Sequence, residues 1–328
     1  MGVDSLPTES LEPRKIFITE FTSPEQYAVA NGLLTPGLNG PVQSGFFARV
    51  VRLDLPLLRI KTGEASNPVS MVGGIPETHA FTFSTRSSAP RVLSGREITE
   101  DILFHPRPND LLHGSSPSGR PWPWATVTID YETMARDGAG LAGKLISPPR
   151  NDIAMVRADP AARLRLIDLI RDATRVAENR PEIIHAPNAA RAISGSIMEA
   201  LVNCLMQGAF EYDRAAVRRH RHIMRRLEDL LSARPQQVLT LPEICASVGV
   251  AQRSLQLICR EFTGLGVTQY ARAMRMRDVR RVLATAIPGE TTVAAVAMQY
   301  GFWELGRFAL AYKTLFGEAP SATLRRLP

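Results

Sequence analysis

The last quarter of the chain carries the most regular pattern of apolar and polar positions. Over residues 241–262, and again over 292–316, a short helical pattern is followed by a glycine and then by a second helical pattern. Gly249 and Gly301 stand where the first helix of each pair has to end, because glycine readily adopts φ > 0. The pattern therefore predicts two helix-turn-helix units, each with a second helix that packs through one face.

The second helix of each unit leaves one face polar. This face carries Gln252, Arg253, Gln256 and Arg260 in the first unit, and Glu304, Arg307 and Lys313 in the second. Amide and guanidinium groups are the ones that hydrogen-bond to base edges in the major groove of DNA. One such pattern also occurs in plain helical bundles, whereas two copies joined by one helix favour a DNA-binding region.

One long helix, expected over residues 268–286, joins the two units. Its apolar stripe consists of Met276, Val279, Val282, Leu283 and Ala286. At ~1.5 Å per residue such a helix spans roughly 28 Å, which is close to the ~34 Å of one DNA turn. The spacing suits two successive major grooves on one face of a duplex.

The first half of the chain has a short, alternating pattern that Gly, Pro and Ser interrupt. From residue 45 to about residue 130 it predicts strands at 47–53, 57–61, 79–84, 102–104 and 124–129, and a hairpin at 91–98 that turns at Gly95. Strands at this spacing indicate a β-sandwich or a small barrel. Residues 1–15 are expected to form a loose tail.

Two helices are expected over about residues 160–207. Asp159 is a suitable N-cap, and Pro160 suits the first turn. In the second helix Ile193, Ile197 and Leu201 form an apolar stripe that either the β-rich part or a second copy of the chain has to cover. We expect a homodimer with this stripe in the contact; packing against the chain's own strands is the alternative.

The charge of the chain is unevenly divided. Residues 210–328 carry eighteen Arg or Lys and ten Asp or Glu, a net charge of +8, whereas the whole chain of 328 residues carries +7. Localised positive charge suits a polyanionic partner. We therefore expect an α+β protein with a β-rich sensing and dimerisation domain over residues 1–209, followed by an all-helical DNA-binding domain over residues 210–328.

Patterns for other chemistry are missing from the sequence. No run of eighteen apolar residues and no signal-peptide start occur, so we expect a cytoplasmic protein without a membrane partner. The three cysteines have no metal spacing, and His79, His105 and His113 do not fit a metal site. Phosphate loops, dinucleotide fingerprints and nucleophile elbows are also missing. We expect no enzyme, and hence no catalytic residue, cofactor or metal.

Trp122 and Trp124 are held by prolines at the entry of a predicted strand. Rigid aromatic rings can wall an apolar pocket at little entropic cost, so both are candidates for contacts to a small-molecule effector. Arg86, Arg91 and Arg96 are candidates for pairing with an anionic effector. Packing of the two tryptophans in the core is the alternative.

Residues 211–328 resemble the DNA-binding domain of the AraC/XylS family of bacterial transcription regulators, and the first half resembles that family only loosely. The matching residues are Ile244, Cys245, Gly249, Leu255, Arg275, Met276, Gly289, Gly301, Phe302, Arg307, Phe308, Tyr312, Lys313, Phe316, Gly317, Pro320 and Arg325. The resemblance implies a cupin-like N-terminal barrel and a promoter-binding domain whose base contacts come from the polar faces named above.

On this resemblance we expect a transcription activator that binds double-stranded promoter DNA, responds to a small molecule or a partner, and contacts RNA polymerase. Ala251 departs from a serine cap that is frequent in the family. Leu257 stands where an arginine reader can occur, so the first unit is expected to discriminate fewer bases. Two alternatives stay open. One is a non-specific architectural or protein-interaction protein, and the other is a DNA-repair methyltransferase, whose reactive cysteine needs a His–Arg neighbour that Cys204 lacks.

Overall fold

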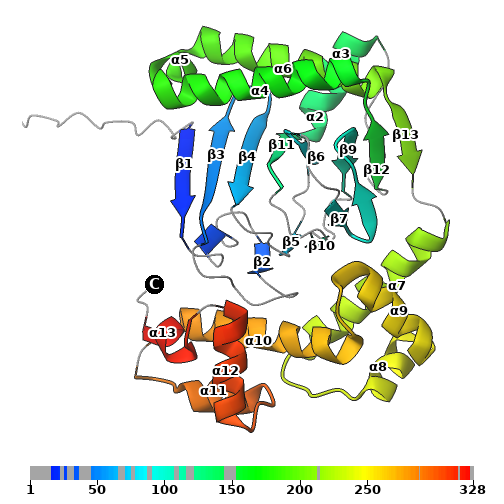
Figure 1. Ribbon diagram of the computed structural model, residues 1–328, viewed down its shortest axis with the longest axis vertical. Coiled ribbons are helices and arrows are strands. Elements are labelled where there is room, and N and C mark those ends of the chain that lie inside the picture. The colour runs from blue at the N-terminus through cyan, green and yellow to red at the C-terminus, as the bar shows by residue number, and fades with distance from the viewer. Residues whose placement is uncertain are drawn as a thin grey trace, which may run out of the picture.

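The chain forms two antiparallel sheets followed by a set of helices (Figure 1). The computed structural model describes residues 16–22, 26–27, 33–36, 46–65, 71–74, 78–86, 91–106, 111–115, 122–143, 153–212, 215–287, 289–316 and 318–325. Sheets come first and helix-turn-helix units last, which confirms the predicted α+β class.

The larger sheet has eight strands in the order β1-β3-β4-β11-β6-β9-β12-β13. Their bounds are Ile16–Phe21 for β1, Ala48–Asp54 for β3, Arg59–Ala65 for β4, Trp124–Ile129 for β11, His79–Ser84 for β6, Ile102–His105 for β9, Ala154–Arg157 for β12 and Ala209–Tyr212 for β13. The sequence pattern missed β1, β12 and β13, all of which lie outside residues 45–130. The β-rich part therefore draws on more of the chain than we predicted.

The smaller sheet has five strands in the order β2-β5-β10-β7-β8. They are Leu33–Pro36 (β2), Met71–Gly74 (β5), Leu111–Ser115 (β10), Arg91–Leu93 (β7) and Arg96–Ile98 (β8). Strands β7 and β8 form the predicted hairpin, with Leu93 opposite Arg96. Ser94 and Gly95 both have positive φ, at 47° and 76°, as the tight two-residue turn of a β-hairpin requires.

Two long helices, α4 (Pro160–Asn179) and α6 (Pro187–Gln207), lie together across one end of the larger sheet, joined by α5 (Pro181–His185) (Figure 1). Asp159 caps α4 as expected, because its carboxylate accepts hydrogen bonds from the backbone N–H groups of Ala161 and Ala162 at 3.0 Å. The shorter α2 (Tyr131–Thr133), a π-helix (Met134–Gly138) and α3 (Ala139–Ala142) follow β11.

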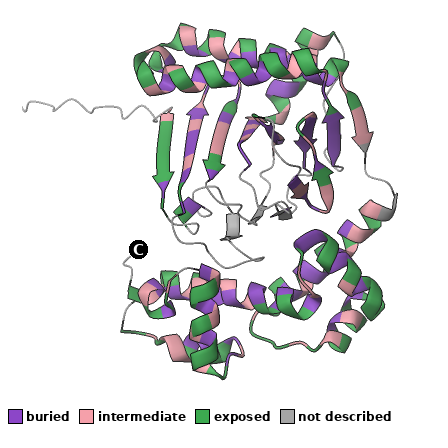
Figure 2. Cartoon of the chain, viewed as in Figure 1, coloured by how far each residue is buried: buried purple, intermediate pink, exposed green. Residues whose placement is uncertain are grey.

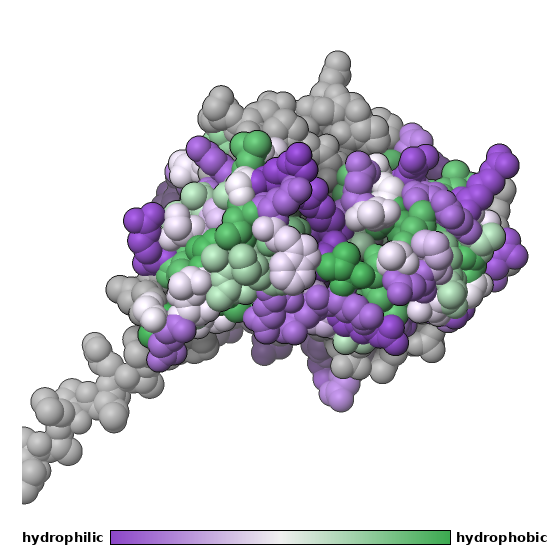
Figure 3. Space-filling model, turned by 90° about the horizontal axis from the view of Figure 1, so that it is seen from below, coloured by the Kyte–Doolittle hydropathy of each residue, from purple (hydrophilic) through white to green (hydrophobic). Residues whose placement is uncertain are grey.

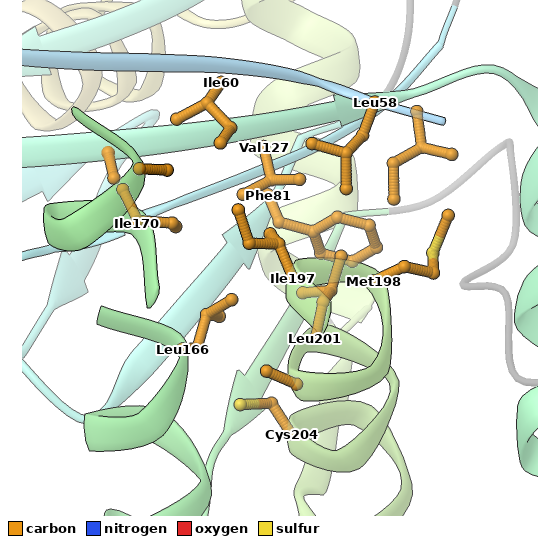
Figure 4. Packing of buried hydrophobic residues seen from close by; sticks show 14 of the residues in the cluster. Leu58, Ile60, Phe81, Val127, Leu166, Ile170, Ile197, Met198, Leu201 and Cys204 are labelled. Atoms are coloured by element: carbon orange, nitrogen blue, oxygen red, sulfur yellow. The ribbon is translucent and has the colours of Figure 1, made fainter. Parts of the chain in front are cut away.

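The apolar stripe of α6 belongs to the core of the chain itself. Ile197 and Leu201 are fully buried, in one cluster with Phe81 of β6, Val127 of β11 and Leu166 of α4 (Figure 4). Placing this stripe in a dimer contact was therefore wrong. An amphipathic pattern shows that a face is covered, but it does not show whether the cover is a sheet of the same chain or a second copy.

The helices after residue 214 form two further cores (Figures 1 and 2). They are α7 (Ala215–Ala233), α8 (Leu241–Val248), α9 (Gln252–Thr263), α10 (Val267–Thr285), α11 (Val293–Gln299), α12 (Leu305–Phe316) and α13 (Pro320–Arg325). The first half of α10 packs with α7, α8 and α9, and the second half packs with α11 and α12. The two helix-turn-helix units are therefore fixed to one rigid helix.

Strand β13 pairs with β12 in the larger sheet and leads towards α7. The boundary that we predict between residues 209 and 210 falls at this strand, and it stays a prediction. Of the helices that the structure describes, none has the length and the apolar content to cross a membrane.

Candidate nucleic-acid interface

The first helix-turn-helix unit consists of α8 and α9. Thr240 and Glu243 form a capping box at the start of α8: the Glu243 carboxylate accepts hydrogen bonds from the backbone N–H and the hydroxyl of Thr240, both at 2.7 Å, which lower the pKa of Glu243. Gly249 ends α8 with a φ of 66°, a conformation that strains any residue with a Cβ. Ala251 precedes α9 without a side-chain cap, as the sequence indicated.

The second unit consists of α11 and α12. The Thr292 hydroxyl accepts a hydrogen bond from the backbone N–H of Ala295 and caps α11. Gly301 has a φ of 76°, and a Cβ there would come within 2.2 Å of the Val238 side chain. Phe308 and Tyr312 anchor α12, with ring centroids 5.6 Å apart. Both units thus have the predicted helix, glycine turn and second helix.

The predicted contact residues of α9 do not all face solvent. Gln252, Arg253 and Arg260 are exposed. The Gln256 amide oxygen instead accepts a hydrogen bond from the backbone N–H of Val267, the first residue of α10, at 3.3 Å. The Gln256 side chain therefore satisfies a backbone N–H group in the first turn of α10. This hydrogen bond has to break before the amide oxygen can accept a hydrogen bond from a base.

The predicted contact residues of α12 and its preceding turn are all exposed. Glu304 and Arg307 form an ion pair at 2.7 Å, with 65% and 81% of their side chains accessible. A pair this exposed contributes little to stability, so Arg307 can exchange it for another acceptor. Lys313 is also exposed, six residues further along α12 and rotated about 120° around the helix axis from Arg307. The exposed basic groups of α9 and α12 are available to a polyanion.

Several arginines of α10 are tied inside the protein. Arg275 donates to the backbone oxygen of Tyr300 at 3.3 Å and lies over the ring of Phe302. Arg277 pairs with the buried Asp278 at 3.1 Å. Arg280 pairs with Glu318 at 3.4 Å. These arginines stabilise the helical cores.

The two tryptophans of the sheet region are largely packed. Trp122 is buried beside Leu93 and Ile98, and the guanidinium carbon of Arg91 lies 5.1 Å from the centre of its ring. Trp124 donates from Nε1 to the Tyr27 hydroxyl at 3.0 Å. Burial lowers the pKa of Arg91 to about 10, which leaves it cationic at neutral pH. The role of both rings in effector binding stays a prediction.

The sheet region touches the first unit through the β7–β8 hairpin. A Cβ added at Gly95 would lie 3.2 Å from the ring of Phe262 and 3.4 Å from a carboxylate oxygen of Glu261. Both residues belong to α9, which also contacts strand β10. The Glu261 carboxylate in turn accepts a hydrogen bond from Nδ1 of His220 in α7 at 3.0 Å. A structural contact therefore joins the smaller sheet to a helix with candidate DNA contacts.

Two of the cysteines, Cys204 and Cys259, and two of the histidines, His79 and His105, are buried. Burial raises the pKa of the Cys204 thiol to about 12 and that of Cys259 to about 11, so neither supplies a thiolate at neutral pH. Within the described ranges no cluster of three or more His, Cys, Asp or Glu side chains could hold a metal. His79 and His105 form a buried pair, and His113 lies on β10.

Comparison with known proteins gives similarity mainly over the helical region. A family model described as a helix-turn-helix domain matches residues 244–326. The "Probable thc operon regulatory protein" of Rhodococcus erythropolis is 35% identical over 147 residues, which are 42% of this chain and 44% of that protein. The "XylDLEGF operon transcriptional activator 2" of Pseudomonas putida is 30% identical over 99 residues, 30% of this chain and 63% of that protein. The chain thus spans about half the length of these curated relatives.

Among solved structures, a probable AraC family transcriptional regulator from Rhodopseudomonas palustris is 31% identical. The match covers 32% of this chain and 95% of that one, with a TM-score of 0.30. The two units and the family model define the C-terminal region as a helix-turn-helix domain. In this region the chain belongs to the AraC/XylS family of bacterial transcription regulators, as the sequence resemblance implied.

Proposed function

We propose that the protein is a sequence-specific DNA-binding transcription regulator that acts as an activator and responds to a small molecule through its sheet region. One observation supports this most strongly: α9 and α12 are equivalent helices with exposed basic side chains, and both are fixed to the 19-residue α10. A helix of that length spans roughly 28 Å, which suits two major grooves about one turn apart. The names of the two relatives, an operon regulatory protein and an operon transcriptional activator, agree with this function.

The contact between the β7–β8 hairpin and α9 offers a route for the response. Arg91 of β7 lies over Trp122, and Gly95 at the tip of the same hairpin meets Phe262 of α9. An effector that binds beside Trp122 would change the position of the hairpin and hence the arrangement of α9. Such coupling requires that the effector binds one of two arrangements more tightly than the other. Contact with RNA polymerase and homodimer formation, through a surface other than the stripe of α6, belong to the same proposal.

Selection from a random duplex library with the full chain tests the function. Sequence-specific binding predicts enrichment of one site with two conserved halves about one turn apart. A non-specific architectural protein would bind the library without enriching any sequence. A protein-interaction module would retain no DNA.

Arg253→Ala should then relax the base preference in one half of the selected site, and Arg307→Ala should relax it in the other half. Both side chains are exposed on the outer faces of their units, and a lost bidentate contact to guanine is worth roughly 1–3 kcal/mol. Repeating the selection with each variant measures the effect. Arg165→Ala, on the exposed face of α4 in the sheet region, is the control. Selected sites that keep both halves unchanged in the Arg253 and Arg307 variants would remove these two residues from the interface.

A further inference from the structure

Two leucines occupy the same position on the two outward-facing helices. Leu257 is the sixth residue of α9, and Leu310 is the sixth residue of α12. Each follows a buried core anchor by two residues, Leu255 in the first unit and Phe308 in the second. The exposed fractions of the two leucines are 64% and 69%. Neither side chain therefore contributes to the core of its own unit.

Single exposed leucines are common on protein surfaces, but these two share a charged setting. Arg253 precedes Leu257 by one turn and Arg260 follows it by about one turn. Arg307 and Lys313 flank Leu310 in the same way. Residues three and four apart lie on one face of a helix, so each leucine stands between two exposed cationic side chains. From the side of the helical region, apolar patches lie among strongly hydrophilic groups (Figure 3).

The neighbouring polar residue of α9 leaves the centre of this face to the leucine. The Gln256 amide oxygen is bonded to the Val267 backbone N–H, so Leu257 is the more exposed side chain next to Arg253 and Arg260. The four flanking cations favour a polyanionic partner over an apolar protein surface. The apolar group that duplex DNA presents in its major groove is the C5-methyl group of thymine.

We propose that Leu257 and Leu310 each contact the C5-methyl group of a thymine, one in each half of the DNA site. The inference rests on the proposed function and adds to it the base that α9 and α12 each distinguish, which is thymine. Because both leucines hold the same position on helices fixed to α10, the two thymines recur about one DNA turn apart, roughly 10 base pairs. The first unit thus reads a base through apolar contact at the position where an arginine reader can occur.

The experiment uses the full chain and the duplex that it selects from a random library. Each thymine of that duplex is replaced in turn by deoxyuridine, which removes only the methyl group. Affinity should fall about fourfold at two positions roughly one turn apart, the effect expected for one buried methyl group. Leu257→Ala should abolish the discrimination between thymine and deoxyuridine at one position, and Leu310→Ala at the other.

Leu164→Ala is the matched control, because Leu164 is 54% exposed on α4 of the sheet region. It should leave both discriminations intact. A selected duplex whose affinity no deoxyuridine changes would overturn the inference while leaving the proposed function standing. So would discrimination that persists in the Leu257 and Leu310 variants. If the full chain enriches no duplex, the proposed function fails and the inference fails with it.

Discussion

Raising the NaCl concentration from 50 to 200 mM should weaken binding of the full chain to its selected duplex about a thousandfold, the loss expected for six phosphate contacts. The helices that follow α8 carry enough exposed cationic side chains for six phosphate contacts. These side chains are Arg253, Arg260, Arg272, Arg281, Arg307, Lys313 and Arg325. Fluorescence anisotropy at four or five salt concentrations gives the slope of affinity against salt.

Single variants separate phosphate contacts from structural arginines. Arg272→Gln should reduce the salt slope by about one unit without altering the selected sequence. Arg171→Gln, at an exposed position of α4 that pairs with Asp168, should leave the slope unchanged. A wild-type affinity that changes less than tenfold across the salt range would contradict a phosphate-binding surface on these helices.

Acidification should destabilise the sheet region through the buried His79–His105 pair, by at most on the order of 5 kcal/mol. The His79 Nδ1 and His105 Nε2 atoms lie 3.0 Å apart. Burial, followed by the nearby charge of His79, lowers the pKa of His105 from 6.5 to about 3. Between these two values the unfolded chain binds a proton that the folded chain does not bind. The stability is therefore fully present above about pH 6.5 and is lost as the pH falls towards 3.

Urea unfolding, followed by circular dichroism between pH 4 and pH 8, measures this dependence. His105→Gln keeps a polar partner for His79 but does not titrate, so its stability should fall less steeply below pH 6.5. His185→Gln, at an exposed position of α5, controls for the loss of a histidine. Equal slopes for the wild type and the His105 variant would show that the pair is not the source of the acid sensitivity.

Local signals in the sequence predicted the helix-turn-helix units well. Gly249 and Gly301 mark turns because their positive φ is a property of one residue. The hairpin at Ser94 and Gly95 was predictable for the same reason. The long α10, expected over residues 268–286, is observed as Val267–Thr285, because helical periodicity is also a local property.

Features that depend on distant partners were not predictable. Gln256 has the chemistry of a base reader, but its bond to Val267 depends on where α10 begins in space. Ile197 has the pattern of an interface residue, yet the larger sheet covers it. Strands β12 and β13 are short and far apart in the sequence, and only their pairing identifies them. Leu310 is apolar, so a search for polar base-contacting residues passed over it. Its equivalence in position to Leu257 would have identified it from the sequence.

The measurement that tests the central claim most directly is a hydroxyl-radical footprint of the full chain on its selected duplex. Two helices fixed to one rigid α10 predict two protected stretches on the same face of the DNA, centred about 10 base pairs apart. A single short protected stretch would contradict the binding of α9 and α12 in successive major grooves. Uniform protection without a repeat would contradict it as well.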